Sequence, residues 1–198
     1  MGVIKSAYQI AMENSKDIEA NKELVETNRL RDEGKRLVSK VIDEASFDVK
    51  GALKAFDKQQ LAWVREGLVQ SLLANLVLPA DEFSLKNNKK IGDAFASTVA
   101  DARKVNMIFS QLETFFKEYL SERKRLVEAL ERQYAPIRKK KEEELSHQLG
   151  RPVKINPNAD PEYQAMVRQY FAQLDVKYNE VLNGAKEELK TIFTKNPA

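Results

Sequence analysis

Two residues in the last third of the chain have the spacing of a metal-binding pair. Glu144 and His147 form a Glu-x-x-His pair on a predicted helix, and ferritin-like bundles use this spacing to present two inward-facing ligands. A dinuclear site of that kind needs two such pairs, whereas this chain has one histidine. We therefore expect no bound metal. We interpret His147 as a surface residue near a helix C-terminus.

Other catalytic patterns are missing from the sequence. There is no cysteine to act as a nucleophile, and no glycine-flanked serine elbow that would expose a serine to the single histidine. Gly51, Gly67 and Gly92 are isolated from one another, so they form neither a dinucleotide fingerprint nor a phosphate-binding loop. We predict a protein that is not an enzyme and that uses no cofactor and no evident small-molecule substrate.

Basic residues are the main candidates for binding. They cluster on a predicted helix at Arg123, Lys124, Arg125, Arg132, Arg138, Lys139, Lys140 and Lys141. A stripe of this kind can bind the phosphates of nucleic acid or an anionic lipid surface. However, glutamates alternate with these residues at spacings of three and four, as in Glu128 and Glu142 to Glu144. We therefore favour intrahelical ion pairs on a solvated face.

A second candidate lies in the proline-bounded segment from Arg151 to Asn158. Val153 and Ile155 are two residues apart, so in an extended backbone both side chains face the same way. They either tuck onto the neighbouring helix, which we favour, or present a small recognition surface at its end.

A long helix must carry most of these residues. From Gly92 to Pro136 the chain has no glycine or proline, and apolar residues recur at spacings of three and four. Continued through Pro136 to Leu149, the helix would be roughly 85 Å long, whereas a compact globule of this length has a radius of gyration of about 16 Å. Continuity through Pro136 is left open by the sequence. The pattern predicts an elongated shape.

Further helices flank the long one. We expect one that reaches Ala45 with a break at Asn14 and Ser15, a short one after Ser46 or Asp48, and an apolar one from Leu61 to Val77 opened by an Asp57–Gln60 capping box. The segment from Asp81 to Lys90 reads as a turn or frayed helix.

The last helix begins at Asp160-Pro161, a cap followed by a first-turn proline, and continues through Asn183 and Gly184. Folding it back about Ile155 would place Tyr163 opposite His147 and Ile192 opposite Glu118.

The predicted fold is all-α: an elongated helical bundle with a long central helix and an antiparallel, coiled-coil-like two-helix arm. N-terminal helices (1–92) would pack on the first part of the long helix. Residues 93–198, with the loop 150–160, would form the hairpin of one continuous domain.

Composition bears on the cellular location of the protein and on the kinds of partner it can bind. Apolar residues make up 42% of the 198, and 33 basic residues nearly balance 30 acidic ones. That balance argues against bulk nucleic-acid binding. The absence of cysteine fits a cytoplasmic location, the N-terminus does not resemble a signal peptide, and no apolar run approaches the roughly 20 residues of a membrane span.

Several short motifs suggest a family. Ile4-Lys5-Ser6-Ala7 followed by Ile10-Ala11, the Gln148-Leu149-Gly150 loop and the Asp160-Pro161-Glu162 helix start resemble a family of uncharacterised bacterial all-helical proteins. The resemblance implies a bacterial setting and transfers no functional residues. From the residues themselves we predict a helical interaction or scaffolding protein with unidentified protein partners, self-associating as a homo-oligomer. The alternative is a binder of an anionic membrane surface or nucleic acid through the basic residues.

Overall fold

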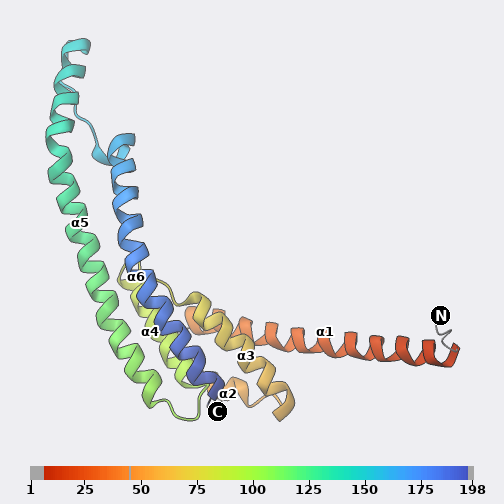
Figure 1. Ribbon diagram of the computed structural model, residues 1–198. Helices are drawn as coiled ribbons and strands as arrows, with labels where there is room; N and C mark the ends of the chain where they lie inside the picture. Colours follow the sequence, from red (N-terminus) through yellow and green to blue (C-terminus); the bar gives the residue numbers. More distant parts are fainter. Residues whose placement is uncertain (1–6, 45, 196–198) are drawn as a thin grey trace. The chain divides into compact units, whose positions relative to one another are not determined.

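The computed structural model describes residues 7–44 and 46–195, and side chains from residue 22 onward. Within these residues the chain forms α-helices and one short 3-10 helix and no β-strand, which confirms the all-α class (Figure 1). The elements are α1 (Ala7–Asp43), α2 (Val49–Leu53), α3 (Lys58–Asn75), α4 (Glu82–Ala96), α5 (Arg103–Leu149), η1 (Pro157–Ala159) and α6 (Pro161–Lys195).

The helices belong to two compact units. Unit 1 comprises Met1–Leu76, Asn87–Asn106 and Lys190–Ala198, and unit 2 comprises Val77–Lys86 and Met107–Leu189. Unit 1 therefore holds α1, α2 and α3, and unit 2 holds most of α5 and α6. Each unit is described separately below.

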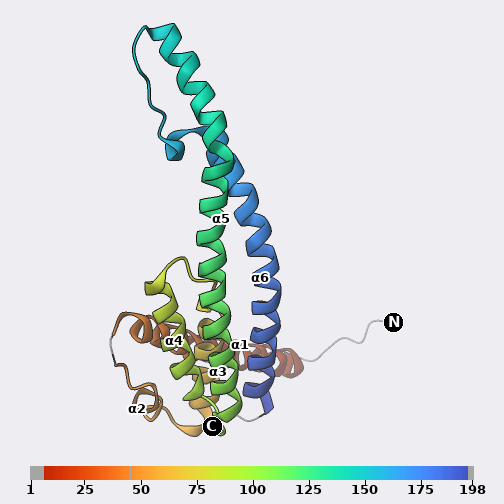
Figure 2. The ribbon, with the colours of Figure 1, turned by 90° about the vertical axis from the view of Figure 1, so that its left-hand side faces the viewer.

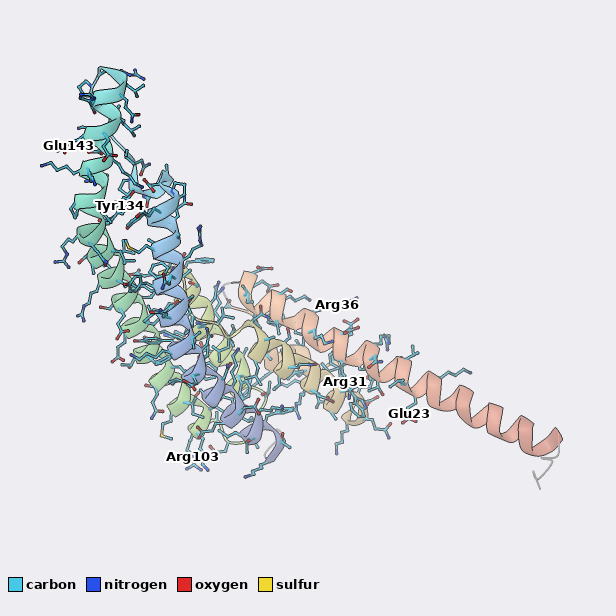
Figure 3. The ribbon with its side chains drawn as sticks, turned by 45° about the horizontal axis from the view of Figure 1, so that its top comes forward. Glu23, Arg31, Arg36, Arg103, Tyr134 and Glu143 are labelled. Carbon is cyan, nitrogen blue, oxygen red and sulfur yellow. The ribbon has the colours of Figure 1, made fainter. Side chains whose placement is uncertain are left out.

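Two glycines allow α1 and α3 of unit 1 to approach closely. A Cβ added at Gly34 would lie 2.0 Å from the carbonyl oxygen of Val64, and one added at Gly67 would lie 2.0 Å from that of Arg31. Only hydrogen fits at these positions, so the two backbones touch. Beside the crossing, the Arg31 guanidinium stacks on the Trp63 ring at 4.7 Å and pairs with Glu66 at 3.1 Å. Figure 3 shows Arg31 on the side of α1 that faces α3.

Side chains at the predicted positions begin the short helices. The Asp48 carboxylate accepts the backbone N–H of Gly51 at the start of α2. Asp57 and Gln60 form the predicted capping box of α3. The α4 helix was not predicted as regular helix: Asp81 accepts from the backbone N–H of Ser84 at 2.8 Å, and the Ser84 hydroxyl accepts from that of Asp81 at 3.0 Å. This reciprocal cap stabilises a helix where the polar sequence had suggested a turn.

Two predicted boundaries are wrong. The backbone of α1 is helical through Asn14 and Ser15, since one polar pair without proline or glycine does not break a helix. The long helix begins at Arg103 instead of Gly92. The chain leaves α4 after Ala96, where the Thr98 hydroxyl donates to the carbonyl of Phe95 at 2.7 Å, and Asp101 then accepts from the backbone N–H of Arg103 at 3.0 Å.

The α5 helix is continuous through Pro136 and contains 47 residues. Proline removes the N–H that would bind the carbonyl of Arg132. Both residues are exposed, so the proline ring meets no packed neighbour and water can reach the freed carbonyl. At about 1.5 Å per residue the helix is roughly 70 Å long.

In unit 2, α5 and α6 run side by side as the predicted antiparallel hairpin (Figure 2). The rings of Tyr134 and Tyr163 lie 5.1 Å apart and those of Tyr119 and Tyr178 lie 5.0 Å apart. Leu130, Tyr134 and Tyr163 form a buried cluster, and Leu126 packs against it. The α6 helix continues through Gly184, as predicted.

The register of the hairpin differs from the prediction. Tyr163 lies opposite Tyr134 rather than His147, a shift of 13 residues or about 20 Å along the helix. The predicted pairing of Ile192 with Glu118 fails in the same way, because Tyr178 already lies opposite Tyr119. The cause is the loop, which runs back along α5 for several residues before α6 begins.

Candidate functional site

The loop between α5 and α6 is fixed by side chains of α5. Gly150 ends the helix with a φ of 65°, a conformation that glycine adopts without strain. The backbone N–H of Val153 then donates to the Ser146 hydroxyl, and that of Ile155 donates to the Glu142 carboxylate, both at 2.8 Å. Val153 and Ile155 are half-buried. The loop thus lies along α5.

A charged cluster closes the end of the hairpin where α6 begins. The Lys141 ammonium contacts Asp160 at 2.9 Å, Glu162 at 2.8 Å and the Tyr134 hydroxyl at 3.2 Å. Asp160 also caps α6 by accepting the backbone N–H of Glu162 at 2.9 Å. In Figure 3, Tyr134 lies between α5 and α6.

The pKa values of this cluster are shifted by the mutual bonds. Hydrogen bonds from Tyr134 and Lys141 lower the pKa of Asp160 to about 2. The carboxylates of Glu162 and Asp160 raise the pKa of Lys141, and burial raises that of Tyr134. At neutral pH the Lys141 ammonium and the Asp160 carboxylate are therefore both charged and paired with each other. The cluster joins the start of α6 to α5.

A second polar contact lies in the middle of the hairpin. The Tyr119 hydroxyl donates to Asp175 at 2.5 Å, and the Arg123 guanidinium lies 4.7 Å from the Phe171 ring. Burial, with the bond to Asp175, raises the pKa of Tyr119 to about 12. Tyr119 therefore stays protonated at neutral pH, and its hydroxyl joins α5 to α6.

The structure separates the predicted basic cluster into several environments. Arg123 stacks on an aromatic ring, Lys141 binds two carboxylates, and Arg138 and Lys139 approach Glu142 and Glu143 at 3.8 and 3.9 Å. The Arg132 side chain donates to the carbonyl of Glu128 at 3.2 Å. The remaining three are exposed and make no ion pair within the described residues: Lys124, Arg125 and Lys140.

Glu144 and His147 are both exposed near the end of α5. Across residues 22–44 and 46–195, whose side chains are described, no group of three or more His, Cys, Asp and Glu residues is placed to hold a metal ion. In the same residues no helix is both long and apolar enough to span a bilayer.

Unit 1 contains a shallow pocket of about 240 Å³ between the end of α1, α2 and α4. Val41, Phe47, Val49 and Ala94 supply its apolar lining. Its central cation, Lys90, donates to the carbonyls of Ile42 at 2.6 Å and Glu44 at 3.0 Å. Lys90 therefore caps the C-terminal end of α1 instead of facing an open site.

Sequence reasoning missed the partners of Lys141 and the Tyr119–Asp175 bond. Lys141 had been grouped with the basic stripe, and Asp160 had been recognised only as a helix cap. Lys141 and Asp160 lie 19 residues apart in the sequence, so they can be recognised as an ion pair only when the path of the loop is known. The tyrosines Tyr134 and Tyr163 were a signal in the sequence for such polar contacts, since a buried tyrosine hydroxyl needs a nearby polar partner.

Comparison with known proteins finds a match to one protein family. Neither the curated proteins nor the solved structures contain a match to this chain. A family profile does match, over residues 50–191, which include α3, α4 and α5 and most of α6 but not α1. The match agrees with the resemblance inferred from the short motifs. Because it covers more than two thirds of the sequence, the chain belongs to DUF6657, a family of unknown function.

Proposed function

We propose that this chain is a non-enzymatic helical interaction protein that self-associates in the cytoplasm through an exposed face of α6 beside the hairpin seam. One observation carries the proposal: an apolar stripe on α6 that the hairpin leaves largely uncovered. The stripe consists of Tyr170, Leu174 and Val181.

The stripe lies beside the buried seam of the hairpin. Tyr170, Leu174 and Val181 occur at positions i, i+4 and i+11, which share one helix face. Tyr170 is 38% exposed and Val181 is 56% exposed, while Leu174 is half-buried. By contrast, Tyr178 and Leu182 on the seam are only 6% and 1% exposed. The apolar surface of α6 is thus wider than α5 can cover, and covering the remainder would be favourable.

A second copy of the chain suits this face. If two α6 helices pack antiparallel about a twofold axis, Tyr170 of one copy meets Val181 of the other. Leu174 then meets Lys177, which lies on the same face of α6 and can cover Leu174 with the aliphatic part of its side chain. A twofold interface uses the same patch on both partners. The α6 helix carries five basic and five acidic residues, so two copies would not repel through net charge.

Analytical ultracentrifugation tests the proposal. We expect the wild type to form a dimer, and Tyr170→Glu or Val181→Glu to shift it to monomer. Val176→Glu is the matched control, because Val176 is 69% exposed on a different side of α6. A wild type that remains monomeric as its concentration rises, or a dimer that both stripe variants leave intact, would contradict the proposal.

The alternative function is binding of nucleic acid or an anionic lipid surface by the basic residues of α5. Its support is the set of exposed basic residues of α5 that make no ion pair among the described residues: Lys124, Arg125 and Lys140. A salt titration of binding to duplex DNA and to anionic vesicles tests it, because phosphate-driven binding weakens steeply with ionic strength.

A further inference from the structure

The end of the hairpin formed by the last two turns of α5 and loop 150–160 exposes apolar side chains. Since Lys141 lies beside Asp160, the last two turns of α5 extend past the start of α6. Within the described part of unit 2, only loop 150–160 lies beside these turns (Figure 1). Leu145 and Leu149 on these turns are 37% and 57% exposed. Two leucines at the same end, next to the half-buried Val153 and Ile155, form an apolar surface without a cover.

The charges near these leucines are mainly positive. At about 100° per residue, Glu143 and Glu144 point roughly 120° and 140° away from Leu149. Glu142 lies on the leucine side, but its carboxylate accepts the N–H of Ile155 at 2.8 Å and approaches Arg138 at 3.8 Å.

The loop adds two basic side chains, Arg151 and Lys154, which are exposed and make no ion pair among the residues described. Among the residues that the structure describes, the apolar surface is therefore bordered by cations without an ion pair, and the carboxylate on its own side, that of Glu142, is already bound.

We propose that this end of the hairpin binds the surface of an anionic lipid bilayer. The site consists of Leu145, Leu149, Val153, Ile155, Arg151 and Lys154. Leu145 and Leu149 would enter the boundary between headgroups and acyl chains, and the two loop cations would pair with anionic headgroups.

A fluid bilayer suits this end better than a protein partner with a fixed shape. The leucines project from the tip of a two-helix hairpin instead of lining a groove, so a rigid partner would need a matching hollow. Headgroups rearrange around projecting side chains without one. The site is separate from the Tyr170 stripe, so the proposal does not depend on self-association, and a Tyr170→Glu variant should bind vesicles as the wild type does.

Vesicle flotation tests the proposal. The probes are vesicles of pure phosphatidylcholine and vesicles of phosphatidylserine and phosphatidylcholine in about a 1:2 ratio. We expect the full chain to float with the anionic vesicles only. Binding should weaken between about 0.1 M and about 1 M salt, where the Debye length falls from about 10 to about 3 Å.

Variants locate the site. Leu149→Ser should weaken vesicle binding about ten-fold, and Lys154→Gln and Arg151→Gln about five-fold each. Matched controls are Val176→Ser, an exposed apolar residue on α6, and Arg168→Gln, an exposed basic residue on α6. Both controls should change binding by about two-fold or less. All of these side chains are exposed or border the solvent, so helix content and melting temperature should stay at the wild-type values.

The wild-type measurement needs no variant and decides the main point. Absence of binding to anionic vesicles at about 0.1 M salt overturns the proposal. So does equal binding by wild type and the Leu149→Ser and Lys154→Gln variants. Binding of duplex DNA in place of vesicles, lost in the same variants, would assign the site to nucleic acid and overturn it as well.

Discussion

Replacing Gly67 by alanine should destabilise unit 1, even though alanine is the better helix former. The added Cβ would lie 2.0 Å from the carbonyl oxygen of Arg31 and 2.7 Å from its Cα. These are backbone atoms of α1, so no side-chain rotation relieves the contact. Restoring ordinary van der Waals separation requires α1 and α3 to move apart by about 1 Å or more. That movement would loosen Val64, Leu68 and Leu72, which are 0% exposed.

Gly67→Ala has two opposing effects on stability: overpacking of the core and a higher helix propensity. Overpacking of a well-packed core costs about 1 to 3 kcal/mol, and we place this case at the upper end because backbone meets backbone. The higher helix propensity of alanine offsets about 1 kcal/mol of this overpacking cost. The net expectation for Gly67→Ala is a loss of about 2 kcal/mol in the free energy of unfolding.

Gly184→Ala is the matched control. Gly184 also lies inside a helix, but an added Cβ there meets nothing within 4 Å. With only the propensity term present, this variant should gain about 0.5 to 1 kcal/mol. The contrast between the two glycines isolates the contribution of the close approach.

Urea unfolding followed by far-UV circular dichroism measures both variants. Fluorescence of Trp63, the single tryptophan, additionally reports on unit 1 because its ring stacks on Arg31. Gly34→Ala combined with Gly67→Ala should cost less than the sum of the single changes, since one separation of the helices relieves both contacts. A Gly67→Ala protein as stable as Gly184→Ala would refute the close approach of α1 and α3.

Three further predictions concern the hairpin. Leu130→Ala should cost about 2 to 5 kcal/mol, measured by urea unfolding, because Leu130 is 2% exposed and packs with Tyr134 and Tyr163; a loss below about 1 kcal/mol would contradict the packing. Folding lowers the pKa of Asp160 to about 2 from an unfolded value of about 3.9, so its stabilisation is present above that value and is lost as pH falls from about 5 to about 2. Melting temperatures across this range should fall less steeply for Asp160→Asn than for wild type, and parallel curves would show that the carboxylate is unbound. Gly150→Ala should lower stability by about 1 to 2 kcal/mol in thermal unfolding, since its φ of 65° is unfavourable for alanine; an unchanged melting temperature would count against this turn.

Much of the local structure was predictable because its causes are local. A capping carboxylate and the backbone N–H that donates to it lie within three residues of each other, so the helix starts at Asp57 and at Asp160 could be recognised from the sequence. The apolar spacing likewise predicted a long α5 and its antiparallel pairing with α6. The start of α5 was misplaced because the break between Ala96 and Arg103 contains neither glycine nor proline, and hydrogen bonds of Thr98 and Asp101 make it.

The candidate sites depended on contacts that spacing alone does not specify. The sequence by itself determined an all-α chain and placed basic residues along one helix. Tertiary structure decided the hairpin register, because Ser146 and Glu142 bind the loop backbone and carry the chain back along α5 before α6 begins. It also decided which cations are paired, since Lys141 meets Asp160 only in that register. Tertiary structure also brings Gly34 and Gly67 together. They lie 33 residues apart in the sequence and form the contact between α1 and α3 because the two helices cross there.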